Sequence, residues 1–586
     1  MGGQQMAKNN GTQQDAKHVN PRIENDRELI NTARRKGRGA LALAFLRLSG
    51  PGWLQSGITI GGVSFSSSLY LGILSGFTFL WLQPLGMILG IVMLSAIAYV
   101  TLSTRQRPLQ AINEHVSPVL GWSWLLASMA ANLVWSMPQF TLGTRAIQQN
   151  LLPGLVGPEA IPDPWGRIIV VGFLLAVCIT VTMFYVAGAR GVKIFEIIIK
   201  VLVSLIVVCF LGVVVRLSFK GVMDWGEALK GLVPDPRFLF RPAEGFTPYL
   251  QAVAEDCRLF WTKLIIRDQR DVMVSAMAAT VGVNMTFLLP YSMLRRGWDR
   301  DFRGLAIFDL STGLFIPFVL ATGFVVMASA SRFYTVPAPG FVPDEQGGIV
   351  SVEPAKNLVE PYKALLKKRL AFEIGEQTVA GLSLQELEQK TGALPYADRR
   401  MAAMLVKRDN FNLAKTLEPL TGPVIAQYLF GLGVMGLGIS AATVLMTING
   451  LCLCELLKKP LGGWTQRIGI LMVSVGALGA ILWKQPAPWL AIPTSAFCTI
   501  LLPIAYVTFF ILMNQKSILG DSMPRGGRRV IWNVLMTLGT AVAIFISVWS
   551  LWSRLRWWGI VVFVAFVGLV LGVHFARKNK RESATA

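Results

Sequence analysis

Small polar residues interrupt an apolar stretch, residues 49–72, that carries no charge and is long enough to enter a bilayer. Gly61 and Gly62 stand at its centre, and each glycine disfavours a helix by roughly 1 kcal/mol. Ser64 and Ser68 follow at positions where a lipid-facing helix would carry Leu. Because broken helices are tolerated at membrane depth only when they pack in protein or line a wet cavity, the stretch predicts a discontinuous first helix bearing half of a substrate site.

A second polar group lies in another apolar stretch, residues 271–294, where Asn284, Thr286 and Pro290 follow Gly282. Pro removes a backbone donor, and Asn and Thr are costly in lipid unless they face the protein interior. Two interrupted spans five helices apart indicate a transporter site between inverted repeats. The free half-helix ends would bind an ion or a polar substrate without charged side chains. The alternative is that these small residues only pack helices together.

Ionisable residues inside the spans are the candidates for energy coupling, and they are few. Glu196 and Asp309 are the predicted coupling residues, while Lys200 and Glu455 lie toward span ends. Pairing with nearby arginines is the competing explanation for all of them. The three His residues lie at span ends or in the amino-terminal tail, so the sequence leaves proton coupling, another driving ion and facilitated diffusion open.

Composition defines the class of protein. Of 586 residues, 53% are hydrophobic and 15% charged, and the mean hydropathy is +0.53. Apolar stretches of membrane-spanning length recur along the chain and predict an all-α polytopic membrane protein. We expect twelve spans, at residues 49–72, 75–102, 117–143, 165–187, 192–216, 271–294, 305–331, 421–451, 467–484, 488–513, 529–552 and 556–576.

The net charge of +22 comes mainly from Lys and Arg in short connections between spans, which is the positive-inside pattern and not that of a nucleic-acid-binding protein. With twelve spans these clusters share one side, so both termini are predicted to be cytoplasmic and the protein integral to a membrane, a bacterial inner (plasma) membrane. The predicted organisation is a partly disordered tail (1–45), helices 1–7 (46–331) with an extracellular loop (217–270), an extramembrane helical insertion (332–420), helices 8–12 (421–576) and a cytoplasmic tail (577–586).

Two details of the extramembrane segments are predicted. Ser383 followed by Glu386 has the spacing of a capping box at the start of a helix in the insertion. In the loop, Phe260, Trp261 and Leu264 share a helical pattern and are expected on the outer membrane surface.

No motif indicates catalysis. The chain has no nucleotide-binding glycine-lysine motif and no kinase motifs, and its spans hold neither paired carboxylates nor a His-rich cluster. Its six Cys have no zinc or disulfide spacing. We therefore expect a protein that is not an enzyme, with no cofactor and no dedicated metal-ligand set.

Several runs resemble those of a known family. They are GPGWL at 50–54, GARGVKIFEIIIKVLV entering the fifth span, IFDLSTGLFIPF in the seventh, LFGLGVMGLGISAATVLMTINGLCLCELL in the eighth and LLPIAYVTFFILMNQKSILG at the end of the tenth. Together they resemble the NRAMP divalent-metal transporters, over most of the chain outside residues 1–45 and 332–420. The resemblance implies a LeuT-type 5+5 inverted repeat of about twelve helices, with helices 1 and 6 discontinuous.

The resemblance fails at the family's ligands. Where the family has Asp-Pro-Gly-Asn in its first helix, this chain has Gly61-Gly62-Val63-Ser64. At the place of Met-Pro-His in the sixth helix we align Thr286-Phe287-Leu288. The third helix offers Gln139 in place of acidic residues, and Ser495 falls near a Gln of the tenth. By this alignment every anionic or soft ligand is replaced, and Gln139, Phe287 and Ser495 join the predicted substrate-binding residues.

A bare transition-metal dication needs carboxylate, imidazole or thioether donors, and neutral hydroxyls and carbonyls do not offset its desolvation. The exchanges also remove volume, so we expect a larger, neutral pocket that carries a bigger solute, such as a metal in a siderophore-like chelator. One alternative is a transporter of Mn, Fe or partly hydrated Mg ions. The other is a receptor or scaffold that does not transport. The expected partners are this substrate and the lipid bilayer, and the sequence leaves the oligomeric state open, with a monomer one option.

Overall fold

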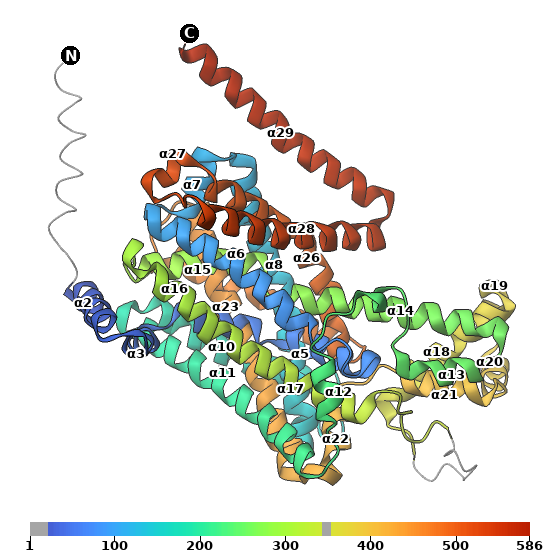
Figure 1. Cartoon of the computed structure of the whole chain (residues 1–586). Coiled ribbons are helices and arrows are strands. Elements are labelled where there is room, and N and C mark those ends of the chain that lie inside the picture. Colours follow the sequence, from blue (N-terminus) through green and yellow to red (C-terminus); the bar gives the residue numbers. More distant parts are fainter. Residues whose placement is uncertain (1–20, 343–352, 586) are drawn as a thin grey trace, which may run out of the picture.

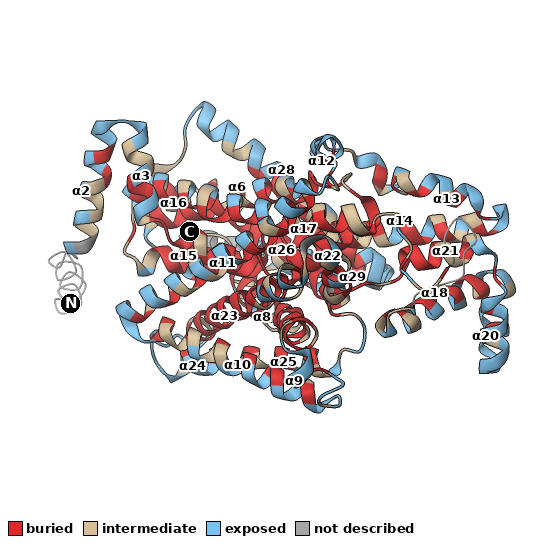
Figure 2. Ribbon diagram, turned by 90° about the horizontal axis from the view of Figure 1, so that it is seen from below, coloured by how far each residue is buried: buried red, intermediate tan, exposed pale blue. Residues whose placement is uncertain are grey.

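The protein is helical throughout the part that the computed structural model describes, residues 21–342 and 353–585. In those residues, eleven helices are long and apolar enough to cross a membrane, or twelve when one bent pair is counted as a single span. This agrees with the twelve spans expected from hydropathy. Buried residues concentrate where the helices cross at the centre of the bundle (Figure 2).

The first span is broken as its glycines predict. Helix α4 (Pro51–Thr59) and helix α5 (Gly62–Ser75) are bent by 55° from each other at residues 60–61. Gly61 precedes α5 as its N-cap in an extended conformation, with φ of −128°. Both half-helices are buried over almost their whole length, as a broken helix at membrane depth requires.

The sixth span is also interrupted, but earlier than expected. Helix α14 (Glu255–Ala278) ends before residues 279–282, and helix α15 (Val283–Arg295) begins after Gly282. Asn284 therefore lies in the first turn of α15, and Pro290 lies inside it without ending it. Membrane helices tolerate such a proline because neighbouring groups satisfy the freed backbone atoms. Position 282 requires glycine, because a Cβ there would lie 2.5 Å from the Trp135 ring.

The other long helices surround these two. They are α6 (Leu82–Thr104), α8 (Pro118–Ala146), α10 (Trp165–Val186), α11 (Gly188–Phe219), α16–η5–α17 (Arg303–Asp309, Leu310–Phe315, Ile316–Phe333), α23 (Phe430–Leu456), α24–η7–α25 (Trp464–Met472, Val473–Gly476, Ala477–Leu482), α26 (Ala491–Met513) and α28 (Gly527–Leu555). Helices α8 and α23 pack closely because Gly438 has no side chain: a Cβ there would lie 2.7 Å from the Gln139 carbonyl oxygen. The last helix, α29 (Trp557–Thr585), leans away from the bundle (Figure 1).

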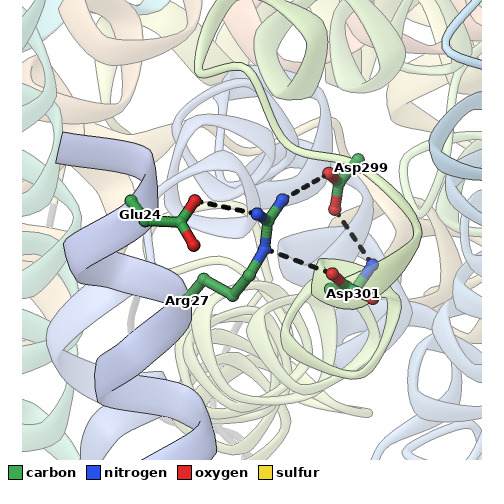
Figure 3. Close-up of polar contacts among 4 residues, drawn as sticks. All are labelled: Glu24, Arg27, Asp299 and Asp301. Atoms are coloured by element: carbon green, nitrogen blue, oxygen red, sulfur yellow. Dashed lines mark hydrogen bonds and ion pairs between the residues drawn. The ribbon is translucent and has the colours of Figure 1, made fainter. Parts of the chain in front are cut away.

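The amino-terminal segment is helical from residue 21; residues 1–20 lie outside the described part. Helices α2 (Pro21–Lys36) and α3 (Arg38–Leu48) lie at the end of the bundle opposite the insertion (Figure 1). We call this the tail end. Helix α2 contacts the rest of the protein through Arg27, which forms ion pairs with Asp299 and Asp301 in the loop after α15 (Figure 3).

The insertion forms a helical unit at the opposite end, which we call the insertion end (Figure 1). Its helices are α18 (Lys356–Ile374), α19 (Glu376–Ala380), α20 (Leu384–Gly392), α21 (Tyr396–Leu405) and α22 (Asn410–Thr421). Residues 343–352 lie outside the described part. The predicted capping box is present: Ser383 Oγ accepts from the Glu386 backbone N–H, and the Glu386 carboxylate accepts from the Ser383 N–H.

Helix α14 crosses the boundary expected at residue 270 and extends out to Glu255. Trp261, expected on the membrane surface, is instead fully buried and donates to Asp398 at 2.6 Å. Arg369 Nε also bonds Asp398 at 2.8 Å. Burial alone would lower the pKa of Arg369, but this hydrogen bond and one to Glu373 raise the pKa above its ordinary value. The helix is therefore extended by packing against the insertion.

Candidate functional site

The break in the first span is held by helix α8. The backbone N–H of Gly62 donates to Gln139 Oε1 at 2.6 Å. A Cβ at Gly61 would lie 2.8 Å from the Ala441 Cβ, and one at Gly62 would lie 2.6 Å from a Leu142 methyl group. The structure thus brings together Gly61, Gly62 and Gln139, and the close approach requires both glycines.

The serines of α5 bond mainly to its own backbone. Ser64 Oγ donates to the Thr59 carbonyl across the break. Ser68 Oγ bonds the Ser64 carbonyl at 2.7 Å and Gln83 Oε1 at 3.1 Å. Ser64 therefore closes the gap between the two half-helices, while Ser68 lies one turn further along α5.

The second break meets the same helix. Asn284 Nδ2 donates to Asn132 Oδ1 at 3.0 Å, and Trp135 packs on Gly282. Asn132, Trp135 and Gln139 recur at helical spacing, so one face of α8 contacts both breaks. Trp135 was missed by the sequence reasoning, although this spacing from Gln139 could have identified it.

Met285 connects the two breaks, and sequence reasoning missed it as well. Its side chain is buried, and its Sδ lies 3.2 Å from Thr59 Oγ1 and 3.4 Å from the Gly282 nitrogen. The expectation that every soft donor is gone was therefore wrong, because a thioether lies three residues after the glycine at the second break. A Met in an apolar helix is usually core packing, which hid this role in the sequence.

Three buried polar atoms at the breaks have no partner in the described part of the chain: Gln55 Oε1, Asn132 Nδ2 and Trp135 Nε1. Gln55 belongs to α4, and its Nε2 donates to the Met285 carbonyl at 3.2 Å. Each such atom costs about 1–3 kcal/mol when left without a partner. We define the junction as the place where the two breaks meet α8, formed by Gln55, Thr59, Asn132, Trp135, Gln139, Asn284 and Met285.

Three other predicted substrate residues lie outside the junction. Thr286 accepts a hydrogen bond from Trp124 Nε1 at 2.8 Å, and the Phe287 ring packs on Trp124 with 4.9 Å between centroids. Both lie inside α15, beyond the break at residues 279–282. Ser495 accepts from Ser275 Oγ at 3.0 Å and thus connects α26 to α14.

The expected enlargement of the pocket is not seen. The side chains of Gln139, Leu142 and Trp135 approach the glycine positions so closely that they fill the volume left by a smaller residue. Gln55, Asn132 and Asn284 are fully buried. In this conformation the junction is closed on all sides by its own side chains.

The predicted coupling residues lie at the tail end of α4. Glu196 Oε2 is 2.6 Å from Arg296 Nη2, and Asp309 Oδ2 accepts from the Gly52 N–H at 2.7 Å. The structure thus separates them from the junction. Among the described residues, no three His, Cys, Asp or Glu side chains gather in a group able to hold a metal ion.

A sequence model of one family, described as natural resistance-associated macrophage protein-like, matches residues 52–368 and 401–553. The chain belongs to the Nramp family. No curated protein sequence matches this Nramp chain.

Solved structures agree with the fold of this Nramp protein. The manganese transporter of Eremococcus coleocola, in complex with an aromatic bis-isothiourea substituted compound, superposes with a TM-score of 0.50 at 14% identity, over 91% of this chain and 93% of the transporter. A point mutant of the same transporter matches with the same score at 15% identity, over 90% and 93% of the two chains. The predicted fold, a LeuT-type 5+5 inverted repeat of about twelve helices, is confirmed.

Proposed function

We propose that this Nramp-family protein is a secondary transporter of a metal and that the junction is its substrate site. The observation that supports this most directly is the set of partnerless polar atoms of Gln55, Asn132 and Trp135 beside two helix breaks. Buried polar atoms are nearly always paired in proteins, and at two neighbouring helix breaks a bound substrate would supply the missing partner. Members of this family are transporters rather than enzymes, which fits the absence of catalytic motifs in the sequence.

The donors available at the junction are neutral. They are an amide oxygen (Gln55), a hydroxyl (Thr59), a thioether (Met285) and the backbone groups freed by the breaks. Gly61 and Ser64 stand where the family resemblance implies an Asp and an Asn, so we propose that the charged part of the family's site has been lost here. Rocking of one repeat against the other would expose this site alternately to the two sides.

Two forms of the metal are supported by different observations. The closed packing and the thioether of Met285 favour a small, soft divalent ion, because thioether sulfur binds such ions. The neutral donor set favours a metal whose charge is already masked by an organic chelator of the siderophore type, because desolvating a bare dication among neutral groups is costly. The transport of manganese by a structural neighbour is in line with either form.

Proteoliposome uptake tests the proposal. Purified protein is assayed with Mn²⁺ and with a ferric hydroxamate chelate. Gln55→Leu is expected to abolish uptake of the transported form with little change in the melting temperature, because loss of the hydrogen bond to the Met285 carbonyl is offset by removal of a buried partnerless oxygen. The matched control is Gln148→Leu, since Gln148 also has a buried partnerless Oε1 and an Nε2 bonded to a backbone carbonyl, at 3.2 Å, but lies away from the junction.

Uptake in Gln55→Leu equal to that of the native protein would place the substrate site elsewhere. No uptake of either form by the native protein would favour a receptor or scaffold.

We propose that the tail end of this integral membrane protein faces the cytoplasm of a bacterium, across its inner membrane, because the basic connections gather on that side.

A further inference from the structure

A cavity of about 870 Å³ lies between helix α18 of the insertion and the insertion ends of α8, α10 and α14. We call it the vestibule. Seven Lys and Arg residues and four Asp and Glu residues line it, so positive charge is in excess. A cleft of one sign repels ions of the same sign and concentrates the opposite sign, and this one disfavours bare divalent cations.

Some charges of the vestibule are already engaged: Arg167 pairs with Asp163, and Lys356 lies 3.7 Å from Glu159. Asp268 pairs with its neighbour Arg267 at 2.8 Å, and Asp409 accepts from the Asn412 backbone N–H at 3.0 Å. In the described chain, four lining cations have no carboxylate within ion-pair distance: Arg145, Lys368, Lys407 and Lys484.

Lys407 connects the vestibule to the first broken helix. Its Nζ lies 3.6 Å from the centroid of the Trp489 ring, and the edge of that ring meets Tyr70 of α5 with 5.0 Å between centroids. Burial lowers the pKa of the Lys407 ammonium below its ordinary value. A half-buried cation that has only an aromatic face as partner gains from a neighbouring anion.

We infer that the vestibule binds a small organic polycarboxylate, with its carboxylates on Lys407 and Arg145 and its carbon skeleton against Trp489. The metal then reaches the junction as an anionic chelate, and its charge is masked before it meets the neutral donors of Gln55 and Met285. This inference rests on the proposed transport function, and it favours the chelated form of the metal over the bare ion.

Calorimetry on the full chain in nanodiscs tests the site, with citrate and ferric citrate as the probes. Lys407→Gln is expected to weaken binding of both about tenfold or more, because it removes a charge-assisted hydrogen bond. Lys407→Arg, which keeps the charge, is expected to restore it. The control is Lys363→Gln, because Lys363 lies on α18 outside the vestibule lining and pairs with Glu388 at 2.6 Å.

No binding of either probe, or equal binding by Lys407→Gln and the native protein, would overturn the inference. Uptake of Mn²⁺ separates this result from failure of the transport proposal. If Mn²⁺ moves and citrate does not bind, the transport function stands and the vestibule inference falls. If citrate binds through Lys407 and no form of the metal moves, the anion site stands and the transport function falls.

Discussion

Arg296 and Glu196 form an ion pair at 2.6 Å that joins the end of α15 to α11. Arg296 Nη1 also donates to the Leu48 carbonyl at 3.2 Å, just before α4, and its guanidinium packs where a side chain at Gly50 would stand. Lys200 Nζ donates to the neighbouring Ser49 carbonyl at 2.9 Å. The tail-end entrances of both broken helices are therefore fastened to each other by charged side chains.

The Arg296–Glu196 pair is expected to hold the tail end closed. Each of Arg296→Gln and Glu196→Gln leaves a half-buried charge without its partner, so each should destabilise the protein, and the double variant should lose less than the sum. We expect a coupling free energy of about 1–3 kcal/mol from a double-mutant cycle measured by unfolding in mixed micelles. Strict additivity of the two changes would show that the pair does not contribute.

Asp309 is expected to anchor α4 rather than to carry a proton. Its Oδ2 accepts from the Gly50 N–H at 3.2 Å and the Gly52 N–H at 2.7 Å, at the positive end of the helix. Asp309→Ala leaves two buried N–H groups without an acceptor and should cost about 1–3 kcal/mol in the free energy of unfolding. Asp309→Asn retains an acceptor and should recover most of the loss.

Uptake measurements provide the check on Asp309. If Asp309→Asn folds normally, we expect its uptake to depend on a pH gradient in the same way as that of the native protein. A normal fold with loss of the pH-gradient dependence alone would instead identify Asp309 as a coupling residue.

The break in the first span could be predicted because Gly61 and Gly62 act locally, through helix propensity. The second break could not be placed from Pro290, because a proline in a buried helix is tolerated, and Gly282 is required by a close contact with Trp135, distant in sequence. The predicted size of the pocket depends on the same kind of contact, because removal of a side chain at Gly62 leaves space only if Gln139 does not fill it.

The junction was predicted in part. Residues that bond across it by simple polar chemistry, such as Gln139 and Asn284, stand out in an apolar span. Met285 does not stand out in the sequence, because a Met in an apolar helix usually packs in the core. Only the fold shows that its sulfur lies beside Thr59. The vestibule could not be predicted from the sequence, because its lining comes from α8, α14, α18 and the segment before α26, which are far apart along the chain.

Asn284 and Asn132 allow a substrate role to be separated from packing. Asn284→Leu leaves the Asn132 amide buried without its partner and should destabilise the protein by about 1–3 kcal/mol, with loss of uptake. Replacing both by Leu removes both polar groups and is expected to recover much of the stability but none of the uptake. The measurements are melting in detergent and proteoliposome uptake of the transported form.

Ser64→Leu provides a second test at the first break, where the Ser64 hydroxyl bonds the Thr59 carbonyl. It should abolish uptake while the protein still folds. If the double Leu variant at 132 and 284 and Ser64→Leu both transported at the native rate, the junction would not be the substrate site.

Arg27 is expected to restrain α15 from the tail end. Its guanidinium contacts three carboxylates, at 2.9 Å to Glu24, 2.7 Å to Asp299 and 3.2 Å to Asp301 (Figure 3). Partly exposed pairs of this kind contribute only about 0–1 kcal/mol each, so Arg27→Ala should leave the melting temperature nearly unchanged. However, two of the three contacts fasten α2 to the loop that follows α15, the half-helix that must move if the junction is to open toward the tail end.

We therefore expect Arg27→Ala to speed amide hydrogen exchange in α2 and in residues 299–303, and to raise the uptake rate without changing the substrate affinity. Arg34→Ala is the matched control, because Arg34 is an exposed arginine of the same helix with no ion pair in the described part of the chain. Equal exchange in the two variants would mean that α2 is held by its apolar contacts, such as that of Ile23 with Gly297, and that the ion pairs do not restrain α15.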